Sequence, residues 1–297
     1  MKQLITRPQV IAFLSVWLAI FLICSLLSGV AYSIKDSLPD QHPDATDPQG
    51  NAAPPVTTTS PAVTTPNPET NEPSVPKDDP YAKLTYTAAN AQYLIYLDAG
   101  HGWSDPGVVI NENGEVCYDS THDHSTDVKE KDINLAITKK LKRALEAMGY
   151  KVGETRPGDN ESDCPVALSE YGMFNVQRRA YFLNEKKPNY CISIHCNSLD
   201  NDTVTHGTRI YHYKNKTASK NFSSQIIQYL MECMELKATQ HETNFAIIRD
   251  CTMPSILVEA GFMTNPTDLA NLLDSYWLDQ FACAIAQGMD AYIHAEN

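Results

Sequence analysis

The sequence predicts an α/β domain with a single mixed, largely parallel sheet and helices on both faces. Three observations predict this fold class. Short apolar runs alternate with longer segments of helical periodicity, these runs read as buried strands, and residues 84–297 are long enough for one sizeable core. A transmembrane helix and a disordered linker are expected to precede the domain.

The transmembrane helix is expected within residues 1–34. Residues 10–31 carry no formal charge, and about 20 apolar residues suffice to cross a bilayer as a helix. Because Lys2 and Arg7 precede this run, the positive-inside rule predicts a cytoplasmic start and a single-pass protein with the remainder outside the cell membrane. The alternative is a signal peptide cleaved after the small residues Gly29 and Ala31, which would release a secreted protein.

A linker is expected over residues 35–83, where Pro, Thr, Asn and Asp dominate the composition. Such a segment cannot bury enough apolar surface to offset the entropy of ordering it, and closely spaced prolines hold it extended. We therefore expect a spacer between the anchor and a folded domain over residues 84–297.

The charge of the chain excludes one class of partner. The formal net charge is −13 at pH 7, whereas a protein that binds nucleic acid through phosphate contacts carries a basic patch. All cysteines except Cys24 fall in the folded domain, and their odd number leaves at least one thiol unpaired. Cys117 and Cys164, which lie in polar stretches, form the only disulfide we expect.

Strand and helix patterns alternate through the folded domain. The expected strands are the short apolar runs at residues 93–97, 151–155, 190–194, 208–213, 245–248 and 255–258. Apolar residues at helical spacing predict helices over residues 133–148, ended by Gly149, over 222–233, from Pro266 onward, and over 281–292. In open sheets of this kind, reactive groups gather at the carboxyl ends of the strands.

Four side chains of the metal-site type fall at such positions. His101 follows the first strand in a glycine-flanked loop, His195 follows the third, Glu259 follows the last, and Glu130 opens the first helix. Each has an ordinary alternative role. The histidines could serve in a turn or bond a backbone carbonyl, Glu259 could be solvated, and Glu130 could form a capping box with Asp127.

Two imidazoles and a carboxylate, with a fourth position left to water, are the ligand set of a catalytic zinc site. The zinc ion lowers the pKa of its bound water to about 7, which makes hydroxide available at neutral pH. A second carboxylate that does not bind the metal can take the proton of the water and return it to a leaving amine. The residue types therefore indicate amide hydrolysis.

Seven segments of the folded domain, in this order, resemble the zinc-dependent N-acetylmuramoyl-L-alanine amidase family, type 3. They are Leu97-Asp-Ala-Gly-His-Gly with Asp105-Pro-Gly, Glu130-Lys-Asp-Ile-Asn-Leu, Gly149-Tyr-Lys-Val with Thr155-Arg, residues 179–184, Ser193-Ile-His-Cys-Asn, Gly207-Thr, and residues 253–266. The resemblance implies His101, Glu130 and His195 as Zn2+ ligands and Glu259 as the catalytic carboxylate. It also implies the substrate, which is the amide between N-acetylmuramic acid and the L-alanine of the peptidoglycan stem peptide.

The chain departs from the family pattern in the first motif. Ala99 stands where the family usually has proline, and Trp103 replaces a common second glycine. No ligand is lost, so we expect activity to be retained. The segment 108–129 is longer than the family norm, and it carries His122 and His124 as competing candidate ligands.

Four further residues are candidates for supporting the site. Asp98 and Asn197 could accept the second N–H of a metal-bound histidine. Trp103 either lines the cleft and stacks on a sugar or peptide, or packs within its loop. Arg179 either orients the site or forms structural hydrogen bonds.

The leading hypothesis is an exported or membrane-anchored peptidoglycan hydrolase of the zinc amidase type, with an activator protein as a further partner. One alternative is a spore-cortex amidase that contributes to muramic lactam formation. Another is a catalytically silent module that binds the wall or activates a second enzyme. A zinc peptidase that cuts peptide–peptide bonds is a third.

Overall fold

The computed structural model describes residues 79–111, 114–117, 126–159 and 176–295. The expected anchor over 1–34 and nearly all of the expected linker lie outside these residues, as do His122, His124 and Cys164. Within the described ranges, no helix combines the length and the apolar character needed to cross a membrane.

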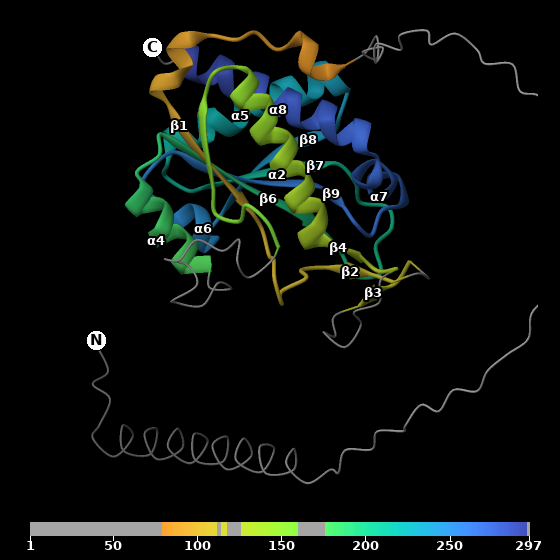
Figure 1. The fold of residues 1–297 in the computed structure, drawn as a ribbon. Coiled ribbons are helices and arrows are strands. Elements are labelled where there is room, and N and C mark those ends of the chain that lie inside the picture. The colour runs from red at the N-terminus through yellow and green to blue at the C-terminus, as the bar shows by residue number, and fades with distance from the viewer. Residues whose placement is uncertain (1–78, 112–113, 118–125, 160–175, 296–297) are drawn as a thin grey trace, which may run out of the picture. The chain divides into compact units, whose positions relative to one another are not determined.

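A six-stranded sheet forms the centre of the described domain, in the order β5-β1-β6-β9-β7-β8 (Figure 1). Its strands are β1 (Leu94–Ala99), β5 (Lys151–Glu154), β6 (Tyr190–Asn197), β7 (Thr208–Tyr213), β8 (Ala238–Thr243) and β9 (Ser255–Phe262). All neighbours pair in parallel except β7 and β9. The predicted mixed, largely parallel sheet is therefore confirmed. Because β7 runs against β9, β7 begins at the edge where β1, β6 and β9 end.

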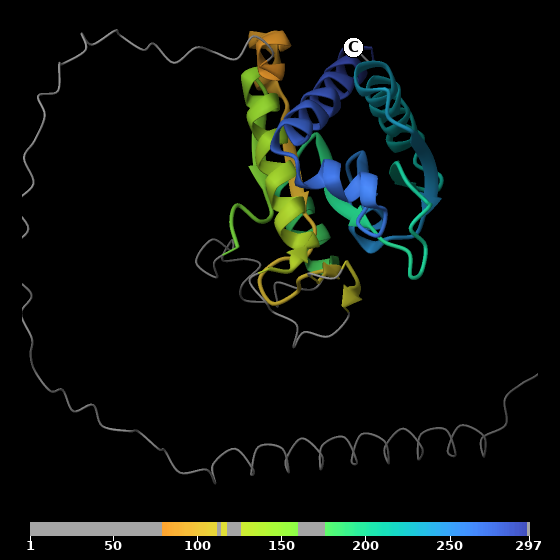
Figure 2. The same cartoon turned by 90° about the vertical axis from the view of Figure 1, so that its right-hand side faces the viewer.

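Helices cover both faces of this sheet (Figures 1 and 2). One face packs against α2 (Glu130–Ala147), α5 (Thr217–Met234) and α8 (Ser275–Ala295), which share the larger hydrophobic core. The other face packs against α4 (Val176–Lys186) and the short α6 (Ala246–Arg249) through a smaller core. Helix α7 (Pro266–Leu273) follows β9, and two 3-10 helices, η1 (Pro80–Lys83) and η2 (Ala88–Gln92), precede β1.

Helix α2 forms where the apolar periodicity predicts it. Ile133, Ile137 and Leu141 fall on one side and are buried against the sheet. Burying such a side chain contributes about 1.5–3 kcal/mol, so this apolar stripe is the main reason the helix is stable in its place. The helix ends at Ala147, and Gly149 just beyond its C-cap has a φ of 95°, the left-handed conformation that glycine adopts without strain.

The predicted strand over residues 245–248 is wrong, because Ala246–Arg249 form α6 and the adjacent strand is β8 instead. A short apolar run does not distinguish a strand from a buried helical turn. The residues of β8, Ala-Thr-Gln-His-Glu-Thr, lack apolar alternation because this strand lies at the sheet edge and pairs only with β7.

The long segment after His101 contains a second, small sheet that the sequence did not predict. Its strands are β2 (Val109–Ile110), β3 (Val116–Cys117) and β4 (Val128–Lys129), in the order β3-β2-β4. Each has only two residues, too few to give a periodic pattern. Cys117 is a free thiol, which contradicts the predicted disulfide with Cys164.

Candidate functional site

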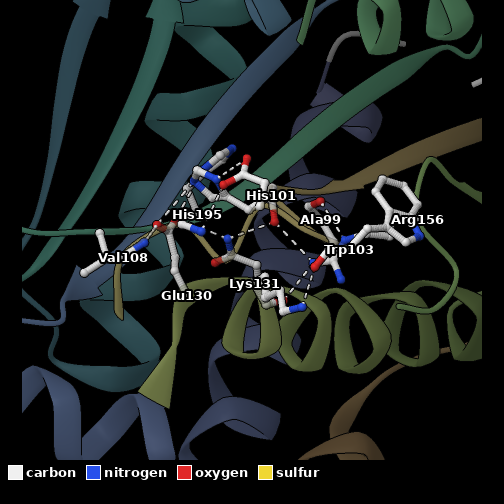
Figure 3. Close-up of polar contacts among 12 residues, drawn as sticks. Ala99, His101, Trp103, Val108, Glu130, Lys131, Arg156 and His195 are labelled. Carbon is white, nitrogen blue, oxygen red and sulfur yellow. Dashed lines mark hydrogen bonds and ion pairs between the residues drawn. The ribbon is translucent and has the colours of Figure 1, made fainter. Parts of the chain in front are cut away.

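Three of the predicted residues meet at the carboxyl edge of the sheet. His101, Glu130 and His195 each offer one ligand atom, and these atoms lie within 4.8 Å of one another (Figure 3). The Nε2 atom of His101 lies 3.3 Å from Glu130 Oε2, and the Nδ1 atom of His195 lies 3.2 Å from Glu130 Oε1. The three residues come from the loop after β1, the start of α2 and the end of β6.

A tight loop turns His101 toward the site. His101 and Trp103 have φ values of 58° and 52°, and Gly102 between them has 124°, so the chain reverses direction at once after β1. The reversal brings Asp105 back to His101, where its carboxylate lies 2.9 Å from Nδ1. The ring is thereby held with its other nitrogen, Nε2, facing Glu130.

Glu130 does not belong to the capping box considered above, because the N-cap residue of α2 is Lys129 and makes no side-chain cap bond. The Glu130 side chain turns into the site, where it is nearly fully buried. Its carboxylate accepts hydrogen bonds from the backbone N–H groups of Val108, at 3.0 Å, and Cys196, at 3.1 Å. These donors fix the carboxylate between the two imidazoles.

His101, Glu130 and His195 stabilise one another's charged forms. Burial opposes ionisation of Glu130, but hydrogen bonds from His101 and His195 outweigh it and hold the pKa of Glu130 below its usual value. Burial likewise opposes the charged form of His101, but Asp105 and Glu130 outweigh it and raise the pKa of His101 to about 10. A pair of carboxylates thus creates a strong preference for positive charge at this point, whether a proton or a metal cation supplies it.

Glu259 lies beside this cluster. Its backbone is in register with His195 on the neighbouring strand, so the two side chains leave the sheet on the same face. Its Oε2 atom is buried and has no hydrogen-bond partner among the described residues. Burial raises the pKa of Glu259 to about 7, against the opposing charge of His195. A carboxylate oxygen buried without a partner is costly, which is typical of a group held ready for a reaction.

Two glycines leave the room that the cluster needs. A Cβ atom on Gly100 would lie 2.2 Å from Cε1 of His195, and one on Gly107 would lie 2.6 Å from Oε2 of Glu130. Two imidazole nitrogens and a carboxylate, brought together in such a cradle beside an unpartnered acid, fit the donor set that zinc prefers in catalytic sites. The residues present therefore suit a resident zinc ion.

We predict that Gly100→Ala lowers zinc affinity at least about 10-fold, because the added methyl group displaces the His195 ring. Zinc titration with a competing chelator measures this, and circular dichroism checks the fold. Gly114→Ala is the control, because a Cβ there meets nothing within 4 Å, although the φ of Gly114 is positive and that of Gly100 is not. Equal zinc affinity in both variants would contradict the role assigned to Gly100.

A buried ionic network around Asp98 holds the loop that carries His101. Asp98 is nearly fully buried and accepts hydrogen bonds from Thr155, Ser193 and Arg179. Burial opposes its ionisation, but Arg179 and the two hydroxyl groups outweigh it and keep the pKa of Asp98 below its usual value. Arg179 also donates to the backbone carbonyls of Ala99 and His101, so this network fixes the main chain on either side of Gly100.

The supporting residues expected from the sequence are only partly in the expected roles. Arg179 orients the loop through the backbone, whereas Asp98 bonds Thr155, Ser193 and Arg179 instead of a histidine ring. The side-chain oxygen of Asn197 accepts from the N–H of Ser198. Trp103 is 8% exposed and packs near Phe182, which favours the loop-packing alternative over stacking on a ligand.

The sequence did not predict the roles of two residues near the site, Asp105 and Arg156. Asp105 enters the sequence prediction only as part of a motif, whereas in the structure its carboxylate bonds the His101 ring. Its spacing of four residues from a glycine-flanked histidine is the signal that could have identified it. Arg156 is fully buried and donates to the carbonyls of Gly100 and Lys131, which ties the loop to α2 (Figure 3).

Comparisons with known proteins point to one family. A family model described as N-acetylmuramoyl-L-alanine amidase matches residues 95–291. The chain is 32% identical over 200 residues to a probable cell wall amidase, LytH, of Staphylococcus saprophyticus, an alignment that covers 67% of this chain and 57% of the relative. It is 24% identical over 204 residues to a germination-specific N-acetylmuramoyl-L-alanine amidase of Bacillus subtilis, covering 67% of this chain and 79% of that one.

The fold is also similar to solved structures. One of them is the CwlD amidase of Clostridioides difficile in complex with the GerS lipoprotein, with a TM-score of 0.57 and 28% sequence identity. The similarity covers 68% of this chain and 99% of that one. The matched part of the present chain is the domain that carries the metal-site cluster.

Proposed function

The chain belongs to the N-acetylmuramoyl-L-alanine amidase family, and on this premise we propose that it hydrolyses peptidoglycan at the amide between N-acetylmuramic acid and the L-alanine of the stem peptide. The observation that carries the proposal is the meeting of His101, Glu130 and His195 beside the unpartnered carboxylate of Glu259. The first three residues would hold a zinc ion, and Glu259 would handle the proton.

When bound, zinc supplies a Lewis acid and lowers the pKa of water to about 7. Asp105 contributes by holding the His101 ring with Nε2 toward Glu130. The backbone donors of Val108 and Cys196 keep the Glu130 carboxylate in place, so the ligand atoms are positioned before a substrate arrives.

Glu259 would serve first as a general base and then as a general acid. As a carboxylate it accepts a proton from the attacking water while the water oxygen forms a bond to the lactyl carbonyl carbon. It then gives that proton to the alanine nitrogen as the C–N bond breaks, which yields a carboxylic acid on the glycan and a free amine on the peptide. A pKa near 7 suits both directions of transfer, because neither protonation state is strongly disfavoured at neutral pH.

The cellular location of the domain is also part of the proposal. An anchor within residues 1–34 and a linker to residue 83 would place the catalytic domain outside the cell membrane, where peptidoglycan lies. The germination-specific relative and the relative solved with a lipoprotein support a narrower alternative, a cortex amidase that acts with an activator. Stimulation of the purified enzyme by a co-expressed lipoprotein would distinguish that alternative from a wall amidase that acts alone.

Digestion of purified peptidoglycan tests the activity. We expect release of peptides with free L-alanine amino termini, together with intact glycan strands, and complete loss of this release after zinc is removed by a chelator. New amino termini at other residues would indicate a peptidase. Stoichiometric zinc without any product would indicate a catalytically silent module.

A further inference from the structure

A positively charged side chain, that of Arg209, lies at the sheet edge that carries His195 and Glu259. Arg209 is the second residue of β7, and its backbone is in register with Glu259 on β9. Because β7 and β9 are antiparallel, the start of β7 lies at the carboxyl edge, and paired residues project from the same face. The sheet thus places His195, Glu259 and Arg209 side by side on three adjacent strands, β6, β9 and β7.

The backbone around Arg209 is held firmly. The hydroxyl group of Thr208 donates to the carbonyl of Ala260, and the N–H of Gly207 donates to Asp268. The guanidinium group lies 4.7 Å from the ring centre of Phe262, which is fully buried. This cation–π contact positions the side chain while leaving its N–H donors to other partners.

The charge of Arg209 interacts electrostatically with the neighbouring Glu259, but no ion pair in the described part of the chain neutralises it. Within the described part of the chain, its guanidinium group forms no ion pair or hydrogen bond, although the whole chain has a formal net charge of −13. Arg179 and Arg156, by contrast, are paired with Asp98 and Asp159. Five donors on a partly buried, positioned guanidinium group suit an external carboxylate, which arginine binds with two parallel hydrogen bonds.

The chemistry of the proposed substrate shows whether the glycan side or the peptide side of the scissile amide supplies that carboxylate. An N-acetylated glycan strand has no ionised group once the lactyl carboxyl is joined to alanine in the scissile amide. The anionic groups of the substrate therefore lie on the peptide side. Neighbouring strands are about 4.8 Å apart, so a guanidinium one strand away from Glu259 reaches roughly one residue beyond the scissile amide.

We propose that Arg209 binds the carboxylate of the stem-peptide residue that follows L-alanine, and so selects peptides in which that group is not amidated. The inference rests on the proposed amidase function. It assigns to Arg209 a role in substrate binding. Glu259 remains the residue that moves the proton.

Two synthetic muramoyl dipeptides that differ only at that group test the proposal, one with a carboxylate and one with a carboxamide. For Arg209→Gln we expect kcat/KM on the carboxylate substrate to fall about 10- to 100-fold, mainly through KM, because one charge-assisted contact is lost. On the carboxamide substrate the same variant should stay within about 3-fold of wild type, and Arg209→Lys should be intermediate on the carboxylate. Arg249→Gln is the matched control, because Arg249 lies on α6 and pairs with Asp250.

The outcomes separate this inference from the function on which it rests. If the wild-type protein cleaves neither dipeptide and releases nothing from the wall, the amidase proposal fails. If the wild type cleaves both dipeptides equally well, or if Arg209→Gln lowers both rates alike, Arg209 does not select the carboxylate. A parallel loss on both substrates with a shifted pH profile would show instead that Arg209 acts through Glu259.

Discussion

Replacing Glu259 with glutamine is expected to reduce kcat by about 10²–10⁴-fold while the protein still binds one zinc ion per chain. The amide of glutamine is close in size to the carboxylate but cannot accept the proton of the attacking water. Glu259 is not among the three residues that face one another as candidate ligands, so its loss leaves that cluster intact. Product release from peptidoglycan and zinc analysis of the same sample measure the two quantities together. Loss of zinc in this variant would contradict the assigned role.

The pH profile gives an independent check on the same residue. Burial raises the pKa of Glu259 to about 7, so the base form accumulates only as the pH rises through 7. We expect kcat/KM of the wild-type protein to rise on the acid side with an apparent pKa close to that value. If Glu259 has no part in the reaction, the rise of kcat/KM on the acid side of the pH profile persists in Glu259→Gln, whether the rate itself is reduced or unchanged.

The raised pKa of Glu259 also makes the stability of the folded protein depend on pH. The folded state binds the Glu259 proton more tightly than the unfolded chain does, so this group favours folding most at low pH and progressively less as the pH rises from its unfolded value through 7. In the presence of chelator, Glu259→Gln should therefore be more stable than wild type at pH 8, by on the order of 2 kcal/mol, and about equal to it at pH 4. Chemical denaturation at both pH values measures the difference.

The sequence identified the four residues of the candidate site because each has a local signature. His101 follows a short apolar strand in a glycine-flanked loop, His195 and Glu259 lie near the ends of apolar strands, and Glu130 opens a helix with a clear apolar stripe. Parallel strands bring their carboxyl ends to one edge, so these local patterns imply a common location. The family motifs then favoured a ligand role over ordinary alternatives such as helix capping.

The residues that support the cluster could not be assigned in this way. Whether Asp98 or Asp105 reaches the His101 ring depends on the loop conformation, which the positive φ angles at residues 101–103 determine. Asp98 lies on β1 opposite Ser193, and this register directs it to the buried network. Arg209 is likewise brought beside Glu259 only by the antiparallel pairing of β7, which the alternation of strands and helices does not reveal.

Replacing His195 with alanine is expected to abolish both zinc binding and hydrolysis. In the proposed site the imidazole supplies one of three ligand atoms, and the two ligands left in the variant would hold zinc too weakly to survive dialysis. Loss of the metal removes several kcal/mol of stabilisation of the developing charge, so the rate should fall by more than about 10³-fold. Zinc content per chain and peptide release are the measurements. His294→Ala is the control, because His294 lies near the end of α8 and bonds Asn90.

Comparing the two inactive variants distinguishes the two parts of the proposed mechanism. Glu259→Gln should contain zinc and fail at proton transfer, whereas His195→Ala should lack zinc and fail before it. Excess zinc should restore part of the activity of His195→Ala, because a weakened site still fills at high metal concentration, and it should not restore Glu259→Gln. If excess zinc rescues Glu259→Gln, that carboxylate acts as a metal ligand, and the proton must be carried by another group.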